Sequence, residues 1–122
     1  MALRNKEKRP GMNWQVMDCR DLSYESSFFD LIIDKSTIDA LLCGENAYTN
    51  VAMMLKECQR VLKTDGYYVA ISYGSPKVRE LHFKQEMLGW KLKTFKIEKT
   101  DNKSGCKSYH FIISLKKYYI YL

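Results

Sequence analysis

An acid and a base, Asp34 and Lys35, stand at the end of an apolar segment in the stretch FDLIIDKSTIDALL. The run Phe28–Asp34 is typical of a strand that is buried on both faces. In an open α/β sheet, ligands bind beyond the carboxyl ends of the parallel strands, where loops and helix N-termini converge. The position of the charged pair therefore predicts a functional site. Capping of the following turn by Asp34 is an alternative that the spacing supports equally well.

Two further polar residues end candidate strands. Asp18 closes the short candidate strand Asn13–Asp18 (NWQVMD), and Tyr73 closes the apolar segment Tyr67–Tyr73 (YYVAISY). The carboxyl ends of parallel strands meet at one edge of a sheet, so we expect both residues at the same edge as Asp34.

Helix and strand patterns alternate along the chain, as in βαβ proteins. Ser36–Asp39 fits a capping box and predicts a short helical turn through Leu42. Asn46–Lys63 predicts a helix with one buried face, because apolar residues recur at spacings of four, three and four: Val51, Leu55, Cys58 and Leu62. We expect Asp65-Gly66 to end this helix, with Gly66 able to adopt the left-handed conformation.

The C-terminal third predicts one helix and two strands. Pro76 suits the first turn of a helix over Lys77–Met87. Trp90–Glu98 alternates as a half-exposed strand, Lys99–Lys107 is a turn, and Tyr109–Leu115 is a last apolar strand. Since these two strands are joined without a helix, we expect them to be antiparallel.

Composition excludes several classes of protein. A chain of 122 residues with 46% apolar content is long enough for one domain, residues 1–122. No run approaches the roughly 18 apolar residues of a membrane span, which predicts a soluble intracellular protein. The four cysteines are scattered without a C-x-x-C pair, so we expect no metal site. The net charge of +6 favours an anionic partner, but the lysines are dispersed and nucleic-acid binding is disfavoured.

Several segments resemble the later two thirds of class I S-adenosylmethionine-dependent methyltransferases: MNWQVMDCRDLSYESSFFDLIIDKSTIDALL, MLKECQRVLKTDGYYVAISYG, GWKLKTFKIEK and YHFIISL. The sequence is most similar to eukaryotic methyltransferase-like enzymes that modify lysines of translation elongation factor 1-alpha. In those enzymes the motif after the strand reads acid, lysine, glycine, threonine; here it reads Asp34-Lys35-Ser36-Thr37, with Ser36 in the glycine position. The resemblance implies an α/β fold with a Rossmann-like sheet, mostly parallel, and an antiparallel C-terminal strand pair.

The resemblance also implies S-adenosylmethionine as cofactor and assigns roles to individual residues. Met17, Asp18 and Cys19 would contact the cofactor, with Asp18 accepting a hydrogen bond from the adenine amino group. Asp34, as a cofactor-binding and catalytic residue, would lie by the sulfonium and orient the incoming lysine amine, since a carboxylate attracts both cations. Lys35, the second candidate catalytic residue, would lie at the same centre and pair with Asp34 or Asp39. The site must also let the neutral amine appear, because an unperturbed lysine has a pKa near 10.4.

The glycine-rich N-terminal part of this family has no counterpart before Gly11, and residues 1–10 (MALRNKEKRP) are similar to the tail of a preceding helix. We therefore expect a truncated sheet whose cofactor binding is weak or absent in the chain alone. The parent enzyme would be cytoplasmic and would methylate a protein such as a translation elongation factor. Two alternatives remain open: a non-catalytic interaction module derived from a methyltransferase, and a basic protein associated with nucleic acid or the ribosome.

A truncated sheet would leave the strand Phe28–Asp34 as an exposed apolar edge, which recruits another strand. Either Asn13–Asp18 closes onto it within the chain, or two chains associate. We expect the homodimer, because the apolar surface of the sheet also needs cover.

Overall fold

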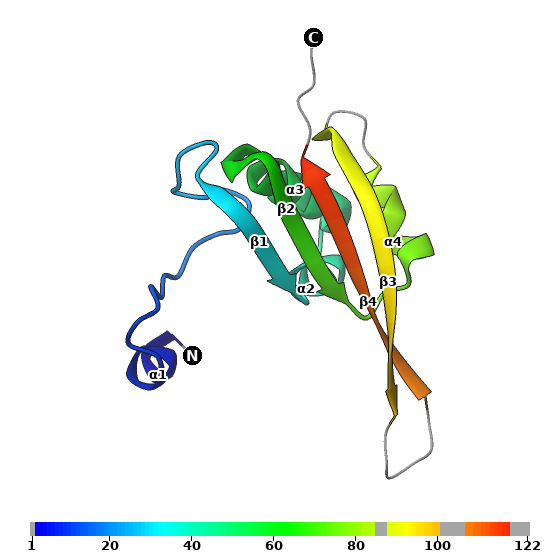
Figure 1. The fold of residues 1–122 in the computed structure, drawn as a ribbon, viewed down its shortest axis with the longest axis horizontal. Helices are drawn as coiled ribbons and strands as arrows, with labels where there is room; N and C mark the ends of the chain where they lie inside the picture. The colour runs from blue at the N-terminus through cyan, green and yellow to red at the C-terminus, as the bar shows by residue number, and fades with distance from the viewer. Residues whose placement is uncertain (1, 85–87, 101–106, 118–122) are drawn as a thin grey trace.

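The computed structural model describes residues 2–84, 88–100 and 107–117. Their centre is a four-stranded sheet of order β1-β2-β4-β3 (Figure 1). The strands are β1 (Phe29–Lys35), β2 (Leu62–Ser72), β3 (Trp90–Thr100) and β4 (Lys107–Lys117).

Strand directions agree with the sequence-based expectation. β1 and β2 are parallel, whereas β4 is antiparallel to both of its neighbours, β2 and β3. Three of the four strands therefore run in one direction, and the C-terminal pair is antiparallel as predicted. The parallel pair is connected through helices, as a parallel connection requires.

Three helices cover one face of this sheet, behind the strands in Figure 1: α2 (Thr37–Leu42), α3 (Ala47–Val61) and α4 (Pro76–Phe83). The fourth, α1 (Ala2–Lys8), lies apart from the sheet. The predicted apolar face of α3 is confirmed, since Val51, Leu55 and Cys58 are buried in the core. The helix α4 ends at Phe83, and its predicted end at Met87 lies outside the described residues, as does most of the predicted turn Lys99–Lys107.

The two faces of the sheet differ sharply in cover. On the helix side of the strands, Tyr68, Ile113 and Leu115 are fully buried. On the opposite side, which we call the open face, large apolar side chains remain exposed: Leu31, Ile33, Tyr67, Phe95 and Ile97. The strand alternation of β1 and β2 thus separates a packed core from an uncovered surface.

The predicted strand Asn13–Asp18 is wrong, because this segment is irregular. A strand needs hydrogen bonds to a neighbouring strand, and no described strand pairs with this segment. Side-chain contacts hold it instead: the Trp14 indole N–H donates to the Arg9 carbonyl at 3.2 Å, and the Tyr24 hydroxyl bonds Gln15 Oε1 at 3.0 Å. The internal closure onto β1 is therefore not formed in this structure.

The predicted helical turn through Leu42 is confirmed as α2, but Ser36 before it has a left-handed backbone (φ 64°) and makes no capping hydrogen bond through its side chain, so the capping box is wrong. The predicted end of the long helix at Asp65-Gly66 is also wrong, because α3 ends at Val61 and both residues lie within β2. There Asp65, rather than Gly66, is left-handed (φ 65°). Gly66 is required for a different reason: a Cβ there would lie 2.8 Å from the Lys63 carbonyl oxygen and 3.0 Å from that of Asp30.

Candidate active site

Asp34 is a buried carboxylate near the carboxyl end of β1, just before α2, with a relative exposure of 6%. Its Oδ1 accepts the backbone N–H of Thr37 at 2.7 Å. Its Oδ2 accepts the backbone N–H of Ile38 at 3.1 Å and the Tyr68 hydroxyl at 2.7 Å. Asp34 therefore caps α2, which was the alternative role predicted for it from the sequence. The three hydrogen bonds also compensate for the burial of its charge.

Asp34 also lies on the wall of a hollow of about 180 Å³. The other lining residues come from the irregular N-terminal segment, β1, α2, α3 and β2: Cys19, Leu22, Ile32, Ile33, Thr37, Met54, Cys58 and Tyr68. Within the described part of the chain, no lysine, arginine or histidine forms an ion pair with Asp34. The hollow thus presents a carboxylate that is held by neutral donors and lacks a cation, in otherwise apolar surroundings.

Titratable neighbours of Asp34 remain neutral at ordinary pH. Burial, reinforced by the Asp34 charge, raises the pKa of Tyr68 well above its usual value. Burial likewise raises the pKa of Cys58 to about 12 and that of Cys19 above its ordinary value. The Tyr68 hydroxyl therefore keeps its proton and acts as a hydrogen-bond donor to Asp34. The role of Tyr68 was not predicted from the sequence, although a tyrosine in a buried strand needs a partner for its hydroxyl.

The structure brings two of the predicted site residues together and separates the rest. Cys19 and Asp34 line the same hollow. Asp18, beside Cys19, is exposed and accepts the Arg20 backbone N–H at 2.9 Å and its guanidinium at 2.7 Å. These bonds lower the pKa of Asp18 to about 2, so it is a carboxylate. Met17 does not line the hollow, and its sulfur accepts the Ser23 N–H at 3.4 Å.

Lys35 is exposed on the open face, where Leu31 and Ile33 also lie, because side chains alternate along β1. The expected ion pair with Asp34 or Asp39 is not formed. Asp34 is occupied by neutral donors, and Asp39 pairs with Arg79 instead, at 2.8 Å.

The Asp39–Arg79 pair belongs to a second polar cluster, which joins the carboxyl ends of the strands to two helices. The Ser72 hydroxyl donates to Asp39, as does the backbone N–H of Tyr73 at 3.0 Å. Burial alone would raise the pKa of Asp39, but these bonds and the Arg79 charge lower it overall. The cluster fixes α2 and α4 against the carboxyl end of β2. Tyr73 directly follows this end of β2, at the edge of the sheet where it was predicted.

A third cluster holds the loop that forms one wall of the hollow. Glu57 accepts the Leu22 backbone N–H at 2.8 Å, while Arg60 donates to the carbonyl oxygens of Leu22 and Tyr24, each at 2.9 Å. The hydrogen bond from Arg60 lowers the pKa of Glu57 to about 2. The loop is therefore anchored to α3 through charged groups.

The residues that line the Asp34 hollow could form one part of a small-molecule site. Small-molecule pockets in proteins have volumes of roughly 300 to 1,000 Å³, and this hollow is smaller. Its carboxylate and apolar wall suit a cationic ligand with an apolar body. No group of three or more histidine, cysteine or acidic residues in the described segments could hold a metal ion. None of the described helices is both long enough and apolar enough to cross a membrane.

The chain belongs to the family described as Methyltransferase domain, whose profile matches residues 1–70. EEF1A lysine methyltransferase 4 of Bos taurus is 34% identical over 92 residues, which cover 69% of this chain and 36% of that protein. The eEF1A lysine and N-terminal methyltransferase of Danio rerio is 30% identical over 109 residues, which cover 89% of this chain and 16% of that protein. The chain thus spans about a third or less of these relatives.

Solved structures show the same fold. A SAM-dependent methyltransferase from Methanosarcina mazei aligns with a TM-score of 0.59 at 16% identity, covering 87% of this chain and 67% of that one. The protein TTHA0409 of Thermus thermophilus, complexed with S-adenosyl-L-methionine, aligns with a TM-score of 0.64 at 16% identity, covering 88% and 56%. The sheet is therefore a Rossmann-like methyltransferase sheet, as the sequence led us to expect.

Proposed function

We propose that this chain is part of an S-adenosylmethionine-dependent methyltransferase whose acceptor is a lysine of a protein. The observation that carries the proposal is the buried Asp34 carboxylate, which lacks a cationic partner among the described residues and lies on the wall of the hollow. A sulfonium and a lysine ammonium are both cations, so each would be attracted to this position. Membership of the methyltransferase family supports the reaction class.

Residues in and beside the hollow would have separate roles in binding the cofactor and orienting the amine. When bound, S-adenosylmethionine supplies a methyl group on a positively charged sulfur. The adenine would lie against Cys19, with Asp18 accepting its amino group. Asp34 has one lone pair left on Oδ1 after its three hydrogen bonds, and with it would orient the incoming amine. Lys35 points away on the open face, so we assign it no proton transfer.

The names of the relatives guide the proposal for the substrate. Both curated relatives are named for lysine methylation of eEF1A, a translation elongation factor. We propose a substrate of this kind, met in the cytoplasm. Because the chain spans 36% of the first relative, we further propose that the 122 residues alone bind the cofactor weakly and are inactive.

Titration of the purified chain with S-adenosylmethionine tests the cofactor assignment. We expect a dissociation constant near the millimolar range, since the small hollow offers few polar contacts. Amide signals of Cys19 and Asp34 should shift in the NMR spectrum, and Asp34→Asn should weaken the shift. Absence of any shift at about 5 mM would refute the assignment, and micromolar affinity would refute the proposed weakness.

The uncovered edge of β1 supports the proposal that two copies associate. Among the described strands, β1 pairs with β2 alone, and its outer backbone groups have no strand partner. Leu31 and Ile33 are 51% and 63% exposed beside this edge. Light scattering should give twice the monomer mass at high micromolar concentration, and Ile33→Lys should lower it. A monomeric mass would contradict this proposal.

A further inference from the structure

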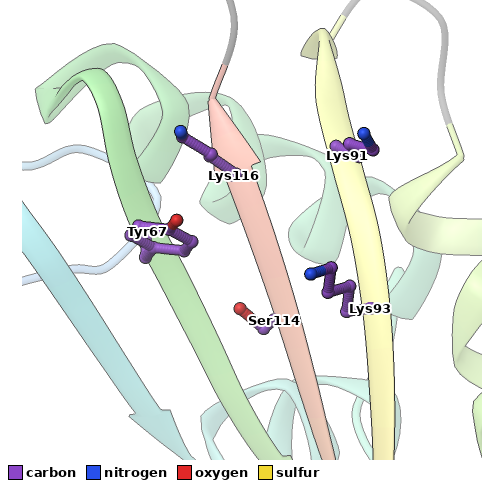
Figure 2. A pocket seen from close by; sticks show the side chains of 5 residues that line it. All are labelled: Tyr67, Lys91, Lys93, Ser114 and Lys116. Carbon is purple, nitrogen blue, oxygen red and sulfur yellow. The ribbon is translucent and has the colours of Figure 1, made fainter.

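Five polar side chains from three adjacent strands line a hollow of about 220 Å³ on the open face: Tyr67, Lys91, Lys93, Ser114 and Lys116 (Figure 2). In Figure 2 the Lys93 side chain extends from β3 toward β4, and that of Lys116 extends from β4 toward β2. This hollow, which we call the basic hollow, shares no lining residue with the hollow that contains Asp34.

Strand register places the side chains of the basic hollow in two rows. Tyr67 is opposite Lys116, which is opposite Lys91. Ser114 is opposite Lys93 in the next row. Directly opposite side chains on an antiparallel pair have Cβ atoms about 4.5 to 5.5 Å apart, and like charges in such positions destabilise the sheet. A negative charge nearby would therefore stabilise the facing lysines on β3 and β4.

Among the described acidic residues, one neutralises part of this positive charge. Asp65 is 3.1 Å from the Lys116 ammonium, which also lies 5.7 Å from the centre of the Tyr67 ring. In the described part of the chain, no acidic residue forms an ion pair with Lys91 or Lys93. Two ammonium groups thus remain unbalanced, next to the hydroxyls of Tyr67 and Ser114.

We propose that the basic hollow binds a phosphoryl group. A phosphate monoester carries about 1.5 to 2 negative charges and three strong acceptor oxygens, which match two ammonium groups and two hydroxyl donors. A single carboxylate offers half the charge and fewer acceptor positions. The site lies on the other face of the sheet from the proposed methyl-transfer centre: Tyr67 lines the basic hollow, whereas its neighbour Tyr68 is buried on the helix side and donates to Asp34.

The surroundings of the basic hollow favour one phosphoryl group over a polymer of phosphates. Further along the same face the exposed residues are apolar, with Phe95 and Ile97 on β3 and Leu31 and Ile33 on β1. Single-stranded nucleic acids are bound by a continuous positive groove that follows the backbone. The lysines of the basic hollow lie at one end of this face, and the apolar residues separate them from Lys35 at the carboxyl end of β1. We therefore infer a small molecule or side chain that bears one phosphate.

Calorimetric titration with inorganic phosphate, O-phosphoserine and glutamate tests the proposal. Both phosphate compounds should bind more tightly than glutamate, and higher ionic strength should weaken them. Tighter binding of O-phosphoserine than of inorganic phosphate would assign the ligand to a phosphorylated side chain, and equal binding to the phosphate group itself. Lys93→Gln should weaken binding about three- to tenfold. Lys77→Gln, an exposed lysine on α4, is the matched control and should change nothing.

Three results would overturn the inference, provided that circular dichroism shows each variant folded. The first is equal binding of glutamate and phosphate. The second is unchanged phosphate binding in both Lys91→Gln and Lys93→Gln. The third is an equal loss of binding in Lys77→Gln, which would mean that overall positive charge, rather than this hollow, attracts the anion.

Discussion

The two hollows of this protein hold their charged groups in opposite ways. Asp34 is buried, and three hydrogen bonds fix its carboxylate before any ligand arrives. Lys91 and Lys93 stand on an uncovered sheet face, and nothing described pairs with them. A preorganised buried charge acts strongly on a ligand, whereas exposed charges are screened by solvent and salt. The difference predicts that changes near Asp34 strongly affect folding, while changes in the basic hollow chiefly affect binding.

The largest effect is expected from Asp34→Ala. This variant leaves the N–H groups of Thr37 and Ile38 and the Tyr68 hydroxyl without their acceptor in a buried setting. We expect a loss of about 2 to 4 kcal/mol in the free energy of unfolding, measured by urea denaturation. Asp30→Ala is the control, because Asp30 is exposed in the same strand. Equal small losses in both variants would remove the contrast between buried and exposed charge.

Arg79→Ala should have the next largest effect. The Arg79 and Asp39 side chains are 13% and 15% exposed, so removal of the guanidinium leaves a largely buried carboxylate without its counter-ion. We expect a loss of about 1 to 3 kcal/mol in the free energy of unfolding. Lys84→Ala removes the exposed partner of Glu80 in the neighbouring ion pair and should cost below about 1 kcal/mol. A comparable loss in both variants would contradict the importance of burial.

A smaller, pH-dependent effect is expected at Glu57. Its pKa is lowered from 4.5 to about 2 in the folded protein, so its stabilising contribution is present above pH 4.5 and is lost as the pH falls toward 2. Glu57→Gln should therefore be less stable than the wild type near neutral pH, and the difference should shrink in acid. Thermal unfolding between pH 7 and pH 2.5 measures it. A constant difference across this range would exclude Glu57 as its source.

Local patterns in the sequence predicted much of the fold. The apolar spacing in Asn46–Lys63 predicted α3. The absence of a helix between the last two strands predicted their antiparallel pairing. The motif beginning at Asp34 located the hollow, and Cys19 proved to line it. These features depend on residues close in sequence or on the resemblance to a family.

Contacts between distant residues were not predictable in this way. The bond from Tyr68 to Asp34 joins residues 34 positions apart, and that from Arg79 to Asp39 spans 40. Asn13–Asp18 has the composition of a strand, but strand formation depends on a neighbour, which the sequence of one segment does not specify. The basic hollow likewise arises from strand register, since its lysines lie far apart along the chain.

In the described segments, four residues other than glycine adopt the left-handed backbone conformation: Ser27, Ser36, Asn46 and Asp65. Three of them stand just before β1, α2 and α3, and Asp65 lies within the irregular start of β2. This conformation costs most side chains about 1 kcal/mol, and branched ones more. The tolerance of the chain to mutation should therefore be uneven. In a saturation library selected for folding, glycine and asparagine should accumulate at Ser36, the position where the similar enzymes carry glycine, while valine and isoleucine should disappear.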